Sequence, residues 1–112
     1  MFVVTEGRFD EFIAEALASL PDELSEAMDN VAIFVEDEAV GRQLLGLFQG
    51  VPLTKRAFHL GAPPDRITLY QGAIFRSCNS EVEVRELVRR TIIHEVAHHF
   101  GISDARLTEL GW

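Results

Sequence analysis

Residues 80–104 read SEVEVRELVRRTIIHEVAHHFGISD, and the architecture of the chain can be worked out from this stretch. Its apolar residues recur every three or four positions, the period of one helix face: Val84, Leu87, Val88, Thr91, Ile92, Val96 and Phe100. Ser80 and Glu83 have the spacing of a capping box, and Gly101 is a natural helix terminator. The pattern predicts one helix from about residue 81 to residue 100, roughly 30 Å long.

Two histidines near the end of this helix are spaced for metal binding. His94 and His98 lie one turn apart on the same face, so their imidazoles can converge on one Zn²⁺. Glu95 lies one step round the helix, from where its carboxylate can reach water at the metal without binding the metal itself. That is the placement of a general base.

A third ligand has to come from beyond the helix, because two ligands do not hold a catalytic zinc. Gly101 can adopt the left-handed conformation and turn the chain back, which brings Asp104 within reach. The resulting set of two histidines and one aspartate leaves a fourth position for water. The alternative is purely structural: two ordinary helix histidines, a C-cap at Gly101, and an N-cap at Ser103 or Asp104.

Residues 94–104, HEVAHHFGISD, resemble the HExxHxxGxxD motif of zincin metallopeptidases with aspartate as third ligand. With NVAIFVED, LLGLFQGVPLT, PDRITLYQG and the terminal ELGW, nearly the whole chain resembles the small, single-domain bacterial zincin-like metallopeptidase family. The resemblance implies Zn²⁺ on His94, His98 and Asp104, with Glu95 as base. It also implies that the strand at residues 67–71 is the edge strand along which zincins lay an extended peptide.

The expected fold class is α+β: one zincin-like domain over residues 1–112, in which a small mixed sheet packs on the long helix beside additional short helices. Sequence patterns predict helices at residues 8–20, 22–30, 39–48 and 104–110, a buried strand at 31–35 and a strand at 67–70. Residues 71–78 are expected to continue that last strand after a bend at Gly72, and residues 53–65 to be mostly loop.

Composition and charge exclude several classes of protein. The chain has 112 residues, 47% of them hydrophobic, 25% charged and without a run of apolar residues long enough to span a membrane. Its net charge of -8 argues against a nucleic-acid partner. A single cysteine and the absence of a signal-like start predict a cytoplasmic protein.

Several other residues are candidates with weaker support. Tyr70 is the better candidate for stabilising an oxyanion, ahead of His59, Arg66 and Arg76. His99 is expected on the helix surface or behind the ligands. Cys78 is expected to be a buried thiol, although some HExxH deformylases use an upstream cysteine as third ligand.

Zincins of the related metzincin class place a methionine below the metal, but both methionines of this chain precede the motif by far. We therefore expect Trp112 to pack beneath the zinc ligands instead, the alternative being an exposed chain end.

The leading functional hypothesis is a zinc-dependent metallopeptidase that cleaves a peptide or protein substrate. The alternative is a catalytically weak or inactive module that binds metal and peptide and has a regulatory role. An RNA-processing metallohydrolase is disfavoured by the acidic charge and by Asp104. An exposed edge strand favours a homodimer on base rates alone.

Overall fold

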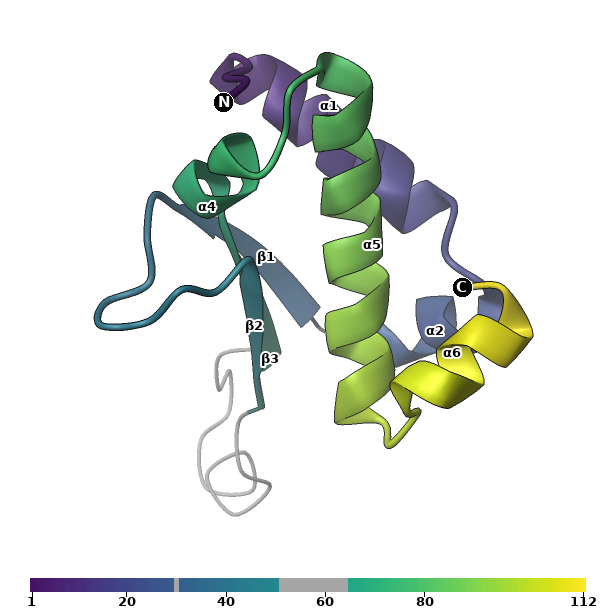
Figure 1. The fold of residues 1–112 in the computed structure, drawn as a ribbon. Coiled ribbons are helices and arrows are strands. Elements are labelled where there is room, and N and C mark those ends of the chain that lie inside the picture. Colours follow the sequence, from purple (N-terminus) through teal and green to yellow (C-terminus); the bar gives the residue numbers. More distant parts are fainter. Residues whose placement is uncertain (30, 51–64) are drawn as a thin grey trace.

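The structure is a computed structural model that describes residues 1–29, 31–50 and 65–112, and its centre is the long helix α5, Glu81–His99 (Figure 1). The predicted cap is present, because the Ser80 hydroxyl accepts a hydrogen bond from the Glu83 amide at 3.2 Å. Gly101 follows the helix with a φ of 82°, in the left-handed region that L residues rarely adopt. The predicted helix is therefore confirmed at both ends.

A three-stranded mixed sheet lies beside α5, in the order β1-β3-β2. Its strands are β1 at Val31–Glu36, β2 at Gly46–Gln49 and β3 at Asp65–Tyr70. β3 pairs in parallel with β1 and antiparallel with β2. Because β2 contacts α5 more extensively than β3 does, the antiparallel edge of the sheet is the one that runs along the helix.

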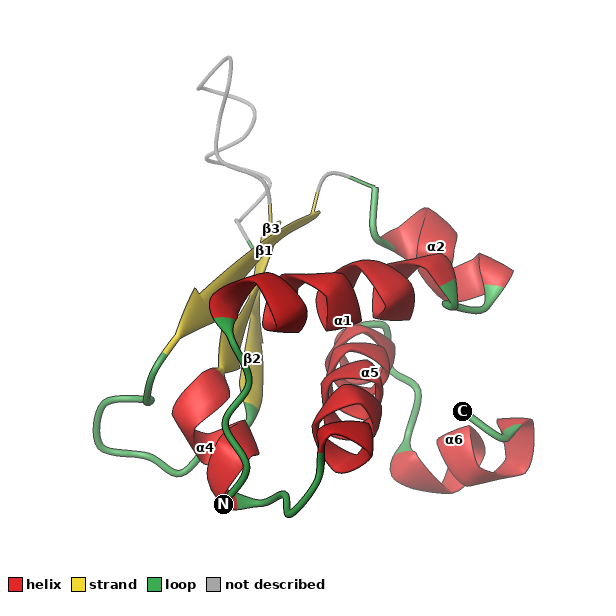
Figure 2. Ribbon diagram, turned by 90° about the horizontal axis from the view of Figure 1, so that it is seen from above, coloured by secondary structure: helices red, strands yellow, loops and turns green. Residues whose placement is uncertain are grey.

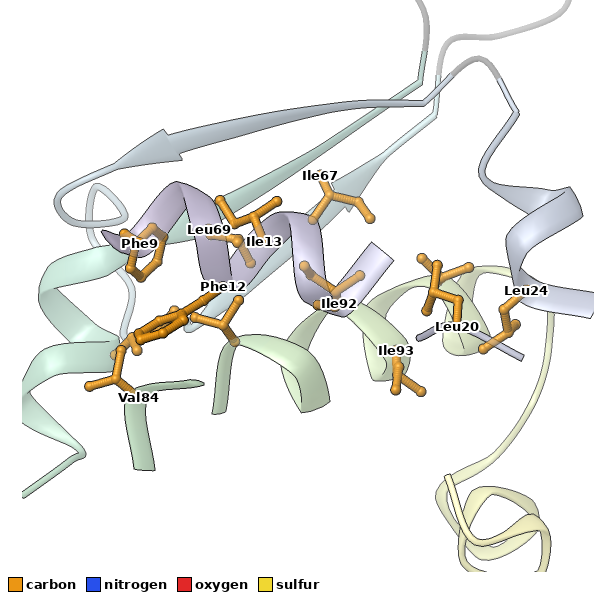
Figure 3. Packing of buried hydrophobic residues seen from close by; sticks show 14 of the residues in the cluster. Phe9, Phe12, Ile13, Leu20, Leu24, Ile67, Leu69, Val84, Ile92 and Ile93 are labelled. Atoms are coloured by element: carbon orange, nitrogen blue, oxygen red, sulfur yellow. The ribbon is translucent and has the colours of Figure 1, made fainter. Parts of the chain in front are cut away.

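The hydrophobic core fills the space between α5, the sheet and α1, Glu6–Ala18, which crosses over α5 (Figure 2). Phe9 and Phe12 of α1 are each 1% exposed, and Ile67 and Ile92 are fully buried on β3 and α5 (Figure 3). Burying a side chain of this size contributes roughly 1.5–3 kcal/mol. This packing fixes α5 against the sheet, and with it the histidines at the end of the helix.

Three short helices complete the described chain: α2 at Asp22–Ala27, α4 at Gln71–Arg76 and α6 at Asp104–Leu110. The α+β class, with a small mixed sheet packed on the long helix beside short helices, is confirmed. Within residues 1–29, 31–50 and 65–112, no helix has the length and apolar character needed to cross a membrane.

Two segments differ in secondary structure from the sequence-based prediction. The helix expected at residues 39–48 is a loop followed by β2, because pairing with β3 determines the conformation of Gly46–Gln49. The strand expected to continue through residues 71–78 is instead α4, whose consecutive residues Ala73, Ile74 and Phe75 are all buried. Tertiary packing overrides the local pattern in both segments.

Two predictions about strand position were also wrong. The strand at residues 31–35 was expected to be buried, but β1 is an edge strand whose Phe34 and Val35 are exposed. The strand at residues 67–71 was expected at the edge, whereas β3 is central and β2 is the edge strand beside α5. His59 and nearly all of the loop predicted at residues 53–65 lie outside the described residues.

Candidate metal centre

A surface hollow of about 240 Å³ lies between residues 43–46, which lead into β2, and the C-terminal half of α5. We call it the β2–α5 hollow. Its lining consists of nine residues, Gln43, Leu44, Leu45, Gly46, Arg90, Thr91, His94, Glu95 and His98. The structure thus brings both predicted histidine ligands and the predicted base to one open site at a sheet edge.

His94 and His98 present their rings on the same side of α5. The ring centroids are 6.0 Å apart and the planes are inclined by 53°. Two imidazoles that share one tetrahedral zinc have centroids roughly 5 Å apart, given zinc–nitrogen bonds of ~2.0–2.1 Å. Small side-chain rotations would therefore bring both rings to one metal ion.

A turn after α5 brings Asp104 back toward these histidines and provides hydrogen bonds to carbonyl groups at the end of the helix. The amides of Gly101 and Ile102 donate to the carbonyls of His98 and Ala97, at 3.0 and 2.9 Å, which defines a Schellman motif. Ser103 then caps α6 by accepting from the Arg106 amide at 3.2 Å. Asp104 is thereby free of the capping role.

The side chain of Asp104 instead contacts the second histidine. Its Oδ1 accepts a hydrogen bond of 2.7 Å from Nε2 of His98. Two ligand atoms on one tetrahedral zinc lie about 3.3 Å apart. Asp104 Oδ1 and His98 Nε2 would therefore need to move apart by only about half an ångström to bind the same ion. Among the described residues, no three His, Cys, Asp or Glu side chains are already gathered around one point. The donor types and their proximity nevertheless fit zinc after rotation of the side chains.

Glu95 lies half-buried in the hollow beside the two histidines. Burial raises the pKa of its carboxyl group, and this effect outweighs the lowering by the Phe48 backbone amide and by His98 and His94. A carboxyl group poised in this way is typical of general acid–base catalysis. The influence of the Phe48 amide on this pKa places the carboxyl group beside β2.

Two features bring β2 close to α5: a glycine without a side chain and a pair of stacked rings. A Cβ placed on Gly46 would lie 2.7 Å from Cγ2 of Thr91, so only glycine permits this approach of strand to helix. The ring of His99 stacks on Phe48 with centroids 3.9 Å apart. His99 is exposed and lies outside the lining of the hollow, which agrees with the predicted position on the helix surface.

The candidates for oxyanion stabilisation that the structure describes do not line the hollow. Tyr70 is 7% exposed and does not line the hollow. Arg66 stacks over Phe34 of β1, and Arg76 is bonded to Glu38. A catalytic role for Tyr70 stays a prediction that this geometry does not favour.

Cys78 and Trp112 are both packed against the core. Cys78 is 2% exposed and lies before α5, whose first residue, Glu81, is roughly 20 Å along the helix axis from His94. Burial raises the pKa of its thiol, so it has the character of an inert core residue.

Trp112 is partly buried, and its amide donates to the Leu107 carbonyl at 2.9 Å. The chain end is therefore held in place, and packing of the indole beneath the ligands stays a prediction.

Sequence reasoning missed the residues that form the strand side of the hollow. Leu44 and Leu45 belong to a segment whose apolar spacing is typical of a helix, so no local signal places them opposite Glu95. Arg90 was also missed, although a signal existed. It precedes His94 by four residues, which puts both on one face of α5.

The sequence matches the zincin-like metallopeptidase family over residues 28–112, and the chain belongs to this family. Its fold is similar to that of a conserved hypothetical protein from Thermo thermophilus, with a TM-score of 0.58. The two are 20% identical, over 86% of this chain and 94% of that one. No curated protein matches the chain at a significant level. Family membership and fold are thus established, and zinc is implied at the level of the family.

Proposed function

We propose that the chain is a zinc-dependent metallopeptidase whose active site is the β2–α5 hollow. The observation that carries this proposal is that His94, Glu95 and His98 line one open hollow while Asp104 contacts His98 from the following turn. His94, His98 and Asp104 would hold the metal. Zinc, when bound, supplies positive charge that polarises a peptide carbonyl and acidifies water.

The backbone of β2 offers a binding edge for substrate. The Tyr70 amide donates to the Leu45 carbonyl at 3.0 Å, so the backbone groups of Leu45 face β3. By the alternation of an antiparallel pair, those of Gly46 and Phe48 face away from β3. The Phe48 amide is directed to Glu95, so an extended peptide would pair with the Gly46 groups of this edge. Such pairing provides affinity with little dependence on side chains.

Glu95 is the residue that moves protons in this proposal. Its carboxylate accepts a proton from the attacking water and later gives a proton to the departing amine. The carboxylate lies beside the Phe48 amide, near the edge of β2 where the peptide would lie. Peptide and base are thus positioned by the same strand.

The test compares zinc content with peptide cleavage in matched variants. Glu95→Gln should keep its zinc, measured by elemental analysis, and lose at least about 100-fold in cleavage of a fluorescence-quenched peptide. Asp104→Ala should lose zinc as well as activity. The control is Glu109→Gln, the same chemical change on an exposed α6 carboxylate paired with Arg106.

Two outcomes would contradict the proposal. Cleavage that survives in Glu95→Gln would remove Glu95 from the mechanism. A zinc-loaded wild-type protein that binds extended peptides without cutting them would be a regulatory binding module instead.

A further inference from the structure

Arg90 is a positively charged residue on the wall of the β2–α5 hollow that the proposed mechanism does not use. It lies one helical turn before His94 and two before His98, and all three side chains line the hollow. It is the only arginine or lysine among the described residues that do so. Arg90 is exposed, and it lies between this hollow and a second one that Glu83 and Glu86 line.

In the described part of the chain, no hydrogen bond or ion pair holds Arg90. Five other arginines there have acidic partners, namely Arg8, Arg76, Arg85, Arg89 and Arg106. The carboxylate best placed for Arg90 is that of Glu86, one turn earlier on α5. Arg89 occupies that carboxylate, with Nε 3.2 Å from each of its oxygens. Arg90 adds only an electrostatic attraction to Glu86, which lowers the pKa of that carboxyl group together with Arg89. Its guanidinium group can therefore still form hydrogen bonds with a carboxylate from another molecule.

The charge distribution of the chain permits an acidic ligand to approach this hollow. Residues 1–38 carry eleven acidic residues and one basic residue. Residues 39–112 carry seven acidic and nine basic residues, and all the residues that line the hollow belong to this second part. The large negative charge of the protein therefore belongs mainly to α1, α2 and β1. The segment that contributes the hollow has a slight excess of positive charge.

We propose that Arg90 selects peptide substrates that carry a carboxylate within one or two residues of the bond to be cut. The inference rests on the proposed function, because it takes the β2–α5 hollow as the place where the peptide lies. Four residues of helix separate Arg90 from His94 by ~6 Å along the axis, and an extended peptide rises ~3.3 Å per residue. A guanidinium group binds a carboxylate through two parallel hydrogen bonds.

The carboxylate could be an aspartate or glutamate side chain or the free end of the peptide. Both present the same planar group, so the experiment uses one peptide series for each source. In the first series, labelled hexapeptides carry one Glu at successive positions, each paired with the Gln analogue. In the second series, one neutral hexapeptide ends in either a free carboxylate or an amide.

Binding is measured by fluorescence anisotropy to zinc-loaded Glu95→Gln protein, which does not require turnover. We expect a preference of roughly tenfold or more for the carboxylate form at one or two positions of one series. The double variant Glu95→Gln/Arg90→Gln should lose this preference, and Arg90→Glu should reverse it toward Lys-containing peptides. Arg42→Gln is the matched control, since Arg42 is an arginine of the neighbouring loop that does not line the hollow.

Three outcomes would overturn the role of Arg90. The acidic and neutral forms could bind equally in both series, neither form could bind, or the preference could survive Arg90→Gln. Failure of the proposed function has a different signature. Wild-type cleavage of neutral and acidic peptides at the same rate rejects the role of Arg90 and retains the peptidase. A carboxylate preference that depends on Arg90, without cleavage by wild type, retains the binding role and rejects the peptidase.

Discussion

The two edges of the sheet show what makes a strand part of a site. β1 is the longer and more apolar edge, with Phe34 46% exposed, and the described residues around it form no group of candidate ligands. β2 has four residues and lies along α5, where Gly46 allows close approach and Phe48 contacts Glu95. The candidate ligands and base lie on α5, so β2 is part of the site because it lies beside this helix. The length and hydrophobicity of a strand do not decide this.

The largest effect is expected from Gly46→Ala, which separates β2 from α5. Its Cβ would lie 2.7 Å from Cγ2 of Thr91, a β-branched side chain that is stiff in a helix. We expect a loss of about 1–3 kcal/mol in the free energy of unfolding, together with weaker peptide binding. Urea unfolding and anisotropy measure the two effects.

A second-site change separates the steric cause from a general effect on folding. Thr91→Ser removes the offending methyl group, so it should recover at least half of the stability lost in Gly46→Ala. The matched substitution on the other edge is Phe34→Thr, which alters an exposed side chain of β1. Peptide binding that falls equally in Phe34→Thr would mean that the two edges do not differ in function.

A smaller effect is expected from Gly72→Ala, which acts at the β1 side of the molecule. The Gly72 amide donates to the Asp37 carbonyl at 2.9 Å, and an added Cβ would lie 2.8 Å from that carbonyl oxygen. We expect a net destabilisation of about 1 kcal/mol, because the clash exceeds the gain in helix propensity. Peptide affinity, measured on the folded protein, should stay the same, and a selective loss of affinity would argue against this division of roles.

The smallest effect is expected from Glu38→Gln, just beyond β1, and it depends on pH. Hydrogen bonding to Arg76 lowers the pKa of the Glu38 carboxyl group in the folded protein. The ion pair therefore stabilises the fold above the ordinary pKa of this group, and that contribution disappears as the pH falls through the lowered value. The difference in urea midpoint between wild type and Glu38→Gln should be present at pH 7 and should shrink as the pH is lowered through the acidic range.

The exposed carboxyl of Glu36, on the same edge strand, provides the control for this measurement. Glu36→Gln removes the same charge without touching the Arg76 pair. A pH dependence equally large in both variants would show that general charge repulsion, and not the pairing with Arg76, is responsible.

Local signals predicted α5 and the residues that lie on it. The Ser80 cap, the left-handed Gly101 and the spacing of His94 and His98 each depend on a few neighbouring residues, so they can be interpreted without the rest of the fold. The approach of Asp104 to His98 follows from the same turn. The assignment of these side chains as zinc ligands and of Glu95 as base stays a prediction.

The strands could not be placed in this way, because their positions depend on distant partners. Residues 44–48 have helix-like spacing and become β2 only by pairing with β3. The apolar run of β1 is typical of a central strand, yet β3 takes the centre of the sheet. α4 begins without a side-chain cap, so nothing in the sequence separates it from the strand before it.

The turn at Gly111 gives the molecule a built-in optical reporter. It holds Trp112, the sole tryptophan, partly buried against the body of the protein at the end of α6. Indole emission should therefore respond to any displacement of α6, the helix that opens with Asp104. Titration with zinc could then be followed by intrinsic fluorescence, without a label or a substrate.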